Sequence, residues 1–414
     1  MRELETKLLL GVALVTGTVA YRAEAITVVA VGDGGTIRHS TDGGGNWFVR
    51  DSGTSESLSG LDCIGHNCYS VGSSGLLIKS TDGGQNWAAL DTGITTHLRA
   101  VKFIDQSNGF IVGDSGTVLK TNDGGVSWSR IPMATSNRYY DIDFVDMQNG
   151  WISVENEMRH TVDGGLNWSF QTMGNVDEIR GIDFIDTNTG WSVTTARGIG
   201  RTIDGGANWS VQSDLPSPRG TLEDVEFVDA DTGWAVGSAG TILHTTNGGL
   251  DWETQSYDGA GSCSAGYPCF FSIAFADKNL GWVAGSRGLI RRTNDGGLNW
   301  LGQSSGTTST FTDIEIIVSG DFNGNGKVEL GDLNLTLFNW NLSEDLLPPD
   351  WVNERPMGAV GINQLNSVLF NWGRVTGDVS VLVPEPVFGL FFLSSFVALA
   401  GLQKTRVTKQ KWRN

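Results

Sequence analysis

The sequence predicts an all-β fold, a seven-bladed β-propeller closed by strands from the two ends of its repeat region. One observation is a turn of the pattern Ser/Thr-x-Asp-Gly-Gly-x-x-Trp, as in residues 80–87, which occurs seven times. The residues at its third position are 40, 41, 40, 41, 43 and 48 positions apart: Asp42, Asp82, Asp123, Asp163, Asp204, Asn247 and Asp295. A period near 41 residues is typical of a four-stranded propeller blade. The 57 glycines of the 414-residue chain suit many short strands joined by tight turns.

The repeated turn has a physical reason for each of its residue types. Gly-Gly supplies positive φ angles without steric cost, and the Asp carboxylate and Ser/Thr hydroxyl bond to the turn's own backbone. The Trp is expected to start the next strand and to turn its ring into the blade. The Asp residues at six of the seven third positions could also be catalytic or metal sites. Because a catalytic group is needed once and not in every blade, we interpret them as turn formers.

The strands of each blade follow from the pattern around the turn. An alternating first strand is expected over residues 99–104, 140–145, 180–185, 224–228 and 272–276. The second strand follows a Gly-aromatic pair, and the third, such as residues 117–121, leads into the turn. The fourth strand leaves from the Trp. The Gly-aromatic pairs are Gly109-Phe110, Gly150-Trp151, Gly190-Trp191, Gly233-Trp234 and Gly281-Trp282.

The first blade lacks its own first strand. Residues 26–32 match a second strand, whereas residues 311–318, after the last turn, match a first strand. The simplest arrangement pairs these two segments and closes the ring, which removes an exposed sheet edge. This pairing fixes the number of blades at seven.

The two ends of the chain predict export and divide it into four parts. Residues 1–25 are interpreted as a signal peptide, with an apolar core over 8–20 and a small-x-small site at Ala23-Glu24-Ala25. The alternative is an uncleaved anchor. The propeller then occupies residues 26–319, a small α-helical domain 320–376 and a sorting region 377–414.

The sorting region contains Pro384, Glu385 and Pro386, followed by an apolar segment over residues 387–402 and a basic tail. Such an apolar segment is just long enough to cross a bilayer, and the trailing cations would remain on the cytoplasmic side. This arrangement resembles a PEP-CTERM sorting signal, which implies processing by an exosortase. A plain C-terminal transmembrane anchor is the alternative. The expected location is the cell surface, outer envelope or extracellular matrix, with membrane anchoring until the tail is processed.

The small domain predicts one calcium site. Residues 321–332 have the spacing of a calcium loop, and residues 365–372 echo the helix expected over 333–340. This pattern resembles a dockerin-type repeat; the alternative is a turn without metal. The ligands would be the side-chain oxygens of four residues and the carbonyl of a fifth: Asp321, Asn323, Asn325 and Asp332, with Lys327.

Charge and cysteine content restrict the partners and the compartment. The net charge is −18 and the pI about 4.6, which argues against a nucleic-acid partner. The four cysteines form two pairs close in sequence, and in an oxidising compartment they predict two disulfides. The pairs are Cys63 with Cys68, and Cys263 with Cys269.

A basic residue precedes the Ser/Thr of every turn. In a closed ring these seven residues would occupy equivalent positions and form an anion-binding or acidic-partner surface. The alternative, which we favour, is that each pairs within its own blade, for instance with the carboxylate of its turn. They are His39, Lys79, Lys120, His160, Arg201, His244 and Arg292.

The turn is the Asp-box, or BNR repeat, shared by sialidases, sortilin-type receptors and several glycosidases. The longer repeats, residues 98–105 (LRAVKFID) with 108–121 (NGFIVGDSGTVLKT), and residues 223–237 (EDVEFVDADTGWAVG) with 240–246 (GTILHTT), narrow the choice. They resemble the propeller of the photosystem II assembly (stability) factor of cyanobacteria and chloroplasts, over about residues 26–319. That family carries an arginine-rich patch, and the resemblance implies a protein-binding propeller without catalytic residues.

The function expected from the sequence is therefore protein binding by an exported, surface-displayed propeller, on one face or at its central channel. The alternative is a secreted glycoside hydrolase, sialidase-like or another Asp-box glycosidase, acting on extracellular polysaccharide. Sialidases carry an Arg-Ile-Pro motif near their start. The one such string here, Arg130-Ile131-Pro132, follows the third Asp-box instead of preceding the first.

Overall fold

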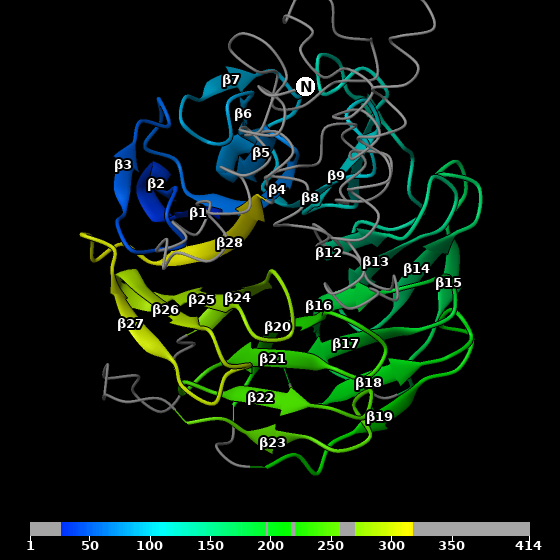
Figure 1. Cartoon of the computed structure of the whole chain (residues 1–414). Helices are drawn as coiled ribbons and strands as arrows, with labels where there is room; N and C mark the ends of the chain where they lie inside the picture. Colours follow the sequence, from blue (N-terminus) through cyan, green and yellow to red (C-terminus); the bar gives the residue numbers. More distant parts are fainter. Residues whose placement is uncertain (1–25, 175, 196–197, 217–219, 257–269, 318–414) are drawn as a thin grey trace, which may run out of the picture. The chain divides into compact units, whose positions relative to one another are not determined.

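A computed structural model describes residues 26–174, 176–195, 198–216, 220–256 and 270–317. In these residues it has seven four-stranded antiparallel sheets, each one blade of a propeller (Figure 1). The all-β, seven-bladed fold is as the sequence predicts. Described residues contain no helix with the length and hydropathy that a membrane span needs. The expected signal peptide, the small domain and the sorting region lie outside the described residues.

The inner strands of neighbouring sheets contact one another in sequence around the ring. They are β28 (Phe311–Ile317), β4 (Leu58–Ile64), β8 (Leu98–Phe103), β12 (Tyr139–Phe144), β16 (Ile179–Phe184), β20 (Leu222–Phe227) and β24 (Phe270–Phe275). The second strands are β1 (Thr27–Gly32), β5 (Asn67–Gly72), β9 (Gly109–Gly113), β13 (Gly150–Val154), β17 (Gly190–Thr194), β21 (Gly233–Gly237) and β25 (Gly281–Gly285).

Third and outer strands complete the blades toward the rim. The third strands are β2 (Thr36–Ser40), β6 (Leu77–Ser80), β10 (Thr117–Thr121), β14 (Met158–Thr161), β18 (Ile199–Thr202), β22 (Ile242–Thr245) and β26 (Leu289–Thr293). The outer strands are short: β3 (Phe48–Arg50), β7 (Ala88–Leu90), β11 (Ser129–Arg130), β15 (Ser169–Gln171), β19 (Ser210–Gln212), β23 (Glu253–Thr254) and β27 (Leu301–Ser304).

The first blade is closed by the two ends of the repeat region. Its sheet has the order β28-β1-β2-β3, and β28 pairs antiparallel with β1, with Ile314 opposite Ala30. Figure 1 shows β28 beside β1 between the first and last blades. The late strand therefore supplies the missing inner strand and completes the four-stranded sheet of the first blade.

Two boundaries differ from the prediction. Several inner strands begin one or two residues earlier, because a buried residue such as Leu98 or Ile179 pairs before a register shift. The outer strands begin one residue after the Trp, not at it. In the second blade the Trp is bonded to its own turn, since the Trp87 Nε1–H donates to the Gly84 carbonyl at 2.9 Å.

Aromatic rings fill five of the seven contacts between neighbouring blades. In each, a second-strand ring stacks on an inner-strand Phe of the next blade, as Trp191 does on Phe227 at 3.5 Å between centroids. That Phe meets the edge of its own Asp-box ring, Trp252, at 5.8 Å. The other stacked pairs are Tyr69–Phe103, Phe110–Phe144, Trp151–Phe184 and Trp234–Phe275. Since stacking crosses blade boundaries, no blade completes its core alone.

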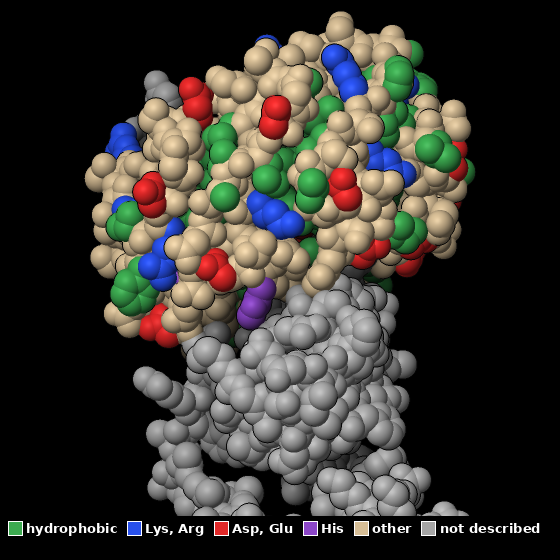
Figure 2. Space-filling model, turned by 90° about the horizontal axis from the view of Figure 1, so that it is seen from above, with side chains coloured by type: hydrophobic (Ala, Val, Ile, Leu, Met, Phe, Trp, Pro, Cys, Tyr) green, Lys and Arg blue, Asp and Glu red, His purple; other side chains and the backbone are tan. Residues whose placement is uncertain are grey.

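The outer surface mixes charges of both signs with single hydrophobic side chains (Figure 2). Several of these hydrophobic residues follow the Gly-Gly pair of an Asp-box, as Val126, Leu166, Leu250 and Leu298 do. Their side chains are 76, 71, 59 and 77 % exposed. The Asp-box turns therefore present apolar tips.

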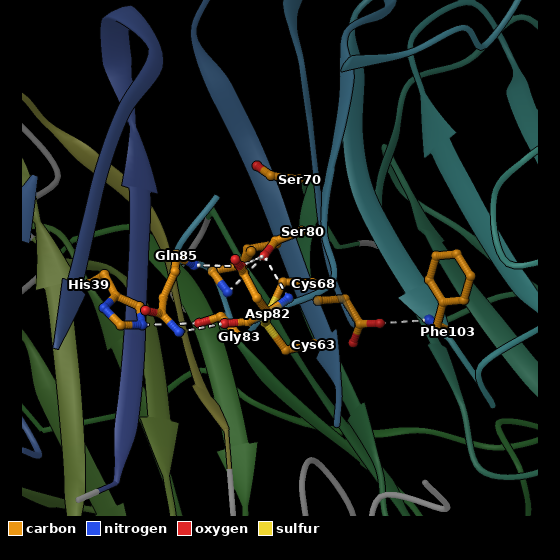
Figure 3. The surroundings of a disulfide bond; sticks show 12 residues. His39, Cys63, Cys68, Ser70, Ser80, Asp82, Gly83, Gln85 and Phe103 are labelled. Carbon is orange, nitrogen blue, oxygen red and sulfur yellow. Dashed lines mark hydrogen bonds between the residues drawn. A yellow bond between two sulfur atoms is a disulfide. The ribbon is translucent and has the colours of Figure 1, made fainter. Parts of the chain in front are cut away.

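The second blade replaces its inner-strand Phe with Cys63, which forms a disulfide with Cys68 across the β4–β5 hairpin (Figure 3). Both cysteines are buried and pack with Val29 of the first blade, which has no ring at the stacking position. A covalent link between β4 and β5 therefore lies where five of the other blades use an aromatic stack. Cys263 and Cys269 lie outside the described residues.

Candidate functional site

The Asp-box carboxylates bond within their own turns. Thr161 Oγ1–H donates to Asp163 Oδ1 at 2.9 Å, and the backbone N–H and side-chain amide of Asn167 donate to its two oxygens at 2.9 and 2.8 Å. These bonds, from the Asn167 side chain first, lower the pKa of Asp163 to about 2. Both oxygens are thus engaged in fixing the turn.

The sixth turn, with Asn247 in place of Asp, keeps the same bonds with the two side chains exchanged. Asn247 Oδ1 accepts from the Thr245 hydroxyl at 2.9 Å and from the Asp251 N–H at 3.0 Å. The Asn247 amide donates to Asp251 Oδ2 at 3.0 Å. The carboxylate has moved to the seventh position of the turn, where five other turns have Asn.

Three of the seven basic residues, His39, Lys79 and Lys120, donate to the next blade and not to the carboxylate of their own turn. Lys79 Nζ donates to the Gly124 carbonyl at 2.9 Å, and Lys120 Nζ to the Gly164 carbonyl at 2.6 Å. His39 Nε2–H donates to the Gly83 carbonyl at 3.0 Å (Figure 3). Each acceptor is the first glycine of the following Asp-box. The expectation that this set binds an anionic partner stays a prediction.

Where the opposite second-strand residue is Trp, its indole replaces the basic residue as donor. Trp191 Nε1–H donates to the Gly248 carbonyl at 2.9 Å, and Trp151, Trp234 and Trp282 make the equivalent bond to Gly205, Gly296 and Gly43. In three of these four blades the basic side chain lies on or over the ring: His160 on Trp151 at 4.7 Å, His244 on Trp234 at 4.9 Å and Arg292 over Trp282 at 5.6 Å. One carbonyl in each turn thus receives a donor from the preceding blade, from one of two paired strand positions or, at Gly124, from both Tyr69 and Lys79.

The central channel is lined by carboxylates that join neighbouring inner strands. Asp143 Oδ2 accepts the Phe184 N–H at 2.9 Å, and Asp224 Oδ2 accepts the Ile273 N–H at 3.0 Å. The same bond runs from the next inner strand to Asp62, Asp141, Asp183 and Asp313. One basic side chain, Lys102, pairs with Asp143 at 3.2 Å. These acids connect the blades at the centre.

Burial raises the pKa of four of the channel acids. It raises the pKa of Asp62 to about 6 and of Asp141, Asp224 and Asp313 to about 7, and repulsion between neighbouring carboxylates adds to the shift. The backbone N–H donors oppose it. Several channel carboxyls are therefore partly protonated at neutral pH.

Two arginines and a tyrosine lie on three successive inner strands, at the second position of each. The Arg99 guanidinium lies 5.2 Å and the Arg180 guanidinium 4.7 Å from the centre of the Tyr140 ring, which is 8 % exposed. Arg99 Nε pairs with Asp114 at 2.6 Å, and Arg180 Nη2 with Glu178 at 2.8 Å. We name Arg99, Tyr140 and Arg180 the mouth cluster.

The mouth cluster retains hydrogen-bonding capacity for a ligand. The Nε atom of Arg180 is buried and has no hydrogen-bond partner among the described residues. Guanidinium groups bind carboxylates and carbonyl oxygens through such N–H donors, and stacking on an aromatic ring fixes their plane. An extended peptide with acidic or carbonyl groups has the matching chemistry.

The mouth cluster and the channel acids were not predicted from the sequence. Their signal was present: Asp141 with Asp143, and Asp224 with Glu226, alternate with apolar residues in strands that are otherwise buried. The predicted calcium ligands and the Pro384–Pro386 motif lie outside the described residues. The described residues contain no group of His, Cys, Asp and Glu that could hold a metal ion.

These observations define a class: an Asp-box propeller whose repeated acids are structural and whose channel opening carries stacked arginines. A family model described as photosynthesis system II assembly factor YCF48 matches residues 88–176, 173–259 and 212–302. The matches together span residues 88–302, more than half of the chain. The chain therefore belongs to this family.

Solved structures share the fold at low identity. "YCF48 bound to D1 peptide" is 18 % identical with a TM-score of 0.53, over 66 % of this chain and 92 % of that one. "YCF48 from Cyanidioschyzon merolae" is 20 % identical with a TM-score of 0.53, over 66 and 96 %. A GH74 xyloglucanase from Xanthomonas campestris is 12 % identical with a TM-score of 0.54, over 68 and 53 %. A comparison with curated proteins gives no match.

Proposed function

We propose that this chain is a non-catalytic assembly-factor propeller that binds an extended segment of a partner protein at the mouth cluster. The observation that carries the proposal is the buried, unpartnered Nε of Arg180, which is held over the Tyr140 ring. The related YCF48 structure with a bound D1 peptide supports a polypeptide ligand. The channel acids accept backbone N–H groups of neighbouring strands, so the proposal assigns them to the scaffold.

Binding of a fluorescently labelled D1 peptide to the full-length chain tests the proposal by fluorescence anisotropy. Arg180→Gln removes a charge-assisted donor, and we expect about tenfold weaker binding. Arg130→Gln is the control, because Arg130 is exposed on the outer strand β11. Equal affinity of the wild type and Arg180→Gln, or the same loss in the control, contradicts a role for the mouth cluster.

We also propose that the chain is exported, held at the cell surface by residues 387–402 until an exosortase processes it, and braced by one calcium ion at residues 321–332. The support is the motif pattern of the two ends and of the small domain. Cell fractionation with and without Pro384–Pro386 tests the location. Calcium titration of the wild type and of the double variant Asp321→Ala/Asp332→Ala tests the metal site. We expect the wild type to bind calcium saturably and the double variant to lose this binding.

A further inference from the structure

A cavity of about 270 Å³ lies between the blade of β16–β19 and the blade of β20–β23. One blade contributes Arg201 on β18 and Trp209 of its Asp-box, and the other contributes the Gly249–Leu250 segment of the next Asp-box. Figure 1 shows β18 and β19 beside β22 and β23. The aliphatic walls are Ile203 and Leu250, which are 67 and 59 % exposed.

The cavity lies at a blade contact where a glutamine side chain does not cover the Gly-Gly pair of the next turn. At two other blade contacts the equivalent glutamine does cover it. Gln171 Nε2 donates to the Gly205 carbonyl at 2.8 Å, and Gln255 Nε2 to the Gly296 carbonyl at 2.8 Å. Both side chains lie against the Gly-Gly pair of the next turn. The equivalent Gln212 instead donates to the Leu250 carbonyl at 2.7 Å, one residue beyond that pair.

Two buried N–H groups in the cavity wall have no hydrogen-bond partner. They are Arg201 Nε and Trp209 Nε1. Unpartnered Trp donors occur in other Asp-boxes of the described residues, but Arg201 differs from the other basic residues of its set. Within the described part of the chain its side chain has no hydrogen bond, ion pair or ring contact. A buried cationic donor without a partner carries a desolvation cost that a ligand would relieve.

The acidic residue in the wall does not neutralise Arg201. Both Asp204 oxygens are engaged by its own turn, with Thr202 Oγ1–H at 2.9 Å and the Asn208 amides at 2.8 Å. No ion pair joins it to Arg201 among the described residues. The net charge of −18 disfavours the association of anions with the chain as a whole. Anion binding here therefore requires a local site.

We infer that this inter-blade cavity binds an organic carboxylate with a short aliphatic body. The Arg201 guanidinium pairs with the carboxylate, and Ile203 and Leu250 contact the aliphatic part. The same chemistry is offered by a peptide that ends in an aliphatic residue and by a free short-chain carboxylate. The site is separate from the mouth cluster and does not depend on the function proposed there.

Isothermal titration calorimetry on the full-length chain tests this site with three probes. N-acetyl-leucine represents a peptide end, hexanoate a free carboxylate, and N-acetyl-leucinamide the same body without the charge. We expect saturable binding of at least one carboxylate and none of the amide. Tighter binding of N-acetyl-leucine identifies a peptide end, and equal or tighter binding of hexanoate identifies a free carboxylate.

Variants connect the binding to the cavity. Arg201→Gln should weaken it about tenfold or more, since a charge-assisted bond is lost. Leu250→Asp, at an exposed position, should abolish binding without touching Arg201. Leu298→Asp is the matched control, because Leu298 holds the same position in the next Asp-box and does not line the cavity. The inference is overturned if no carboxylate saturates, if Arg201→Gln binds as the wild type does, or if both Leu variants lose binding equally.

Discussion

The channel acids predict that this propeller is more stable at mildly acidic than at neutral pH. The perturbation that tests this is Asp224→Asn, which removes one titrating group. The new side-chain carbonyl still accepts the Ile273 N–H. Asp224 has a pKa of about 7, raised first by burial and then by repulsion from Asp313.

The sign follows from proton binding. An acid whose pKa is about 7 when folded and 3.8 when unfolded binds more protons in the folded state, so stability falls as pH rises from about 4 to about 7. Three pH units correspond to about 4 kcal/mol for an isolated group. Asp224 is partly exposed in the channel, where water screens the charge, so we expect Asp224→Asn to gain about 1–3 kcal/mol at pH 7.5.

The Asp-box acids give the opposite dependence of stability on pH below about pH 4, where stability falls as the pH falls. The pKa of Asp123 is lowered to about 2, first by its bond from the Ser127 side chain, and that of Asp163 likewise by Asn167. A lowered folded pKa gives stability that is lost as pH falls through it. The two slopes together place the optimum near pH 4–5.

Urea denaturation followed by tryptophan fluorescence at pH 4.5, 6.0 and 7.5 measures these slopes. The urea midpoint of the wild type should decrease as the pH is raised from 4.5 to 7.5. The midpoint of Asp224→Asn should decrease less and should be higher than that of the wild type at pH 7.5. Asp177→Asn, at an exposed position, is the control and should follow the wild type. A wild-type midpoint that rises with pH, or an Asp224→Asn midpoint below that of the wild type at pH 7.5, refutes the reasoning.

Three further predictions concern the contacts between and within blades. Replacing Cys63 and Cys68 by Ala should cost about 2 kcal/mol of unfolding free energy, and dithiothreitol should then have no further effect. Phe227→Ala, which empties the space between Trp191 and Trp252, should cost about 3–5 kcal/mol by urea titration, against about 0.5 or less for the exposed Phe48→Ala. Lys120→Met removes the side-chain donor to the Gly164 carbonyl and should lower the free energy of unfolding by about 1–2 kcal/mol; an unchanged value would show that the bond contributes nothing.

The part of the fold that could be predicted from the sequence depends on local chemistry. The Gly-Gly pairs take positive φ angles, as at Gly83 and Gly84, and this requirement is visible in any single repeat. The pairing of β28 with β1 followed from counting strands. The first blade lacks its inner strand and one additional strand follows the last blade, so the two together complete one sheet. These inferences needed no knowledge of how blades contact one another.

The contacts between blades were not predictable in the same way. The sequence places each basic residue next to the turn of its own blade. Its side chain could contact that turn or the turn of the next blade, and the sequence does not distinguish the two. Only the position of neighbouring sheets shows that Lys120 reaches Gly164, 44 residues later. The mouth cluster was missed for the same reason, since Arg99, Tyr140 and Arg180 belong to three blades and meet only when the ring closes.

A repeat protein makes seven copies of every contact, so a ligand site has to be sought where the copies differ. The turn carbonyl receives a donor from Trp, Tyr, Lys or His, and this exchange preserves the scaffold. Among the described residues, five arginines have a buried Nε without a hydrogen-bond partner, and two of them belong to the sites proposed above: Arg180 over Tyr140, and Arg201 beside the displaced Gln212. Both leave a buried cationic donor unsatisfied, which costs stability, and binding of an acceptor would recover that cost. Departures that the neighbouring residues do not offset are therefore the positions at which this propeller is expected to bind its partners.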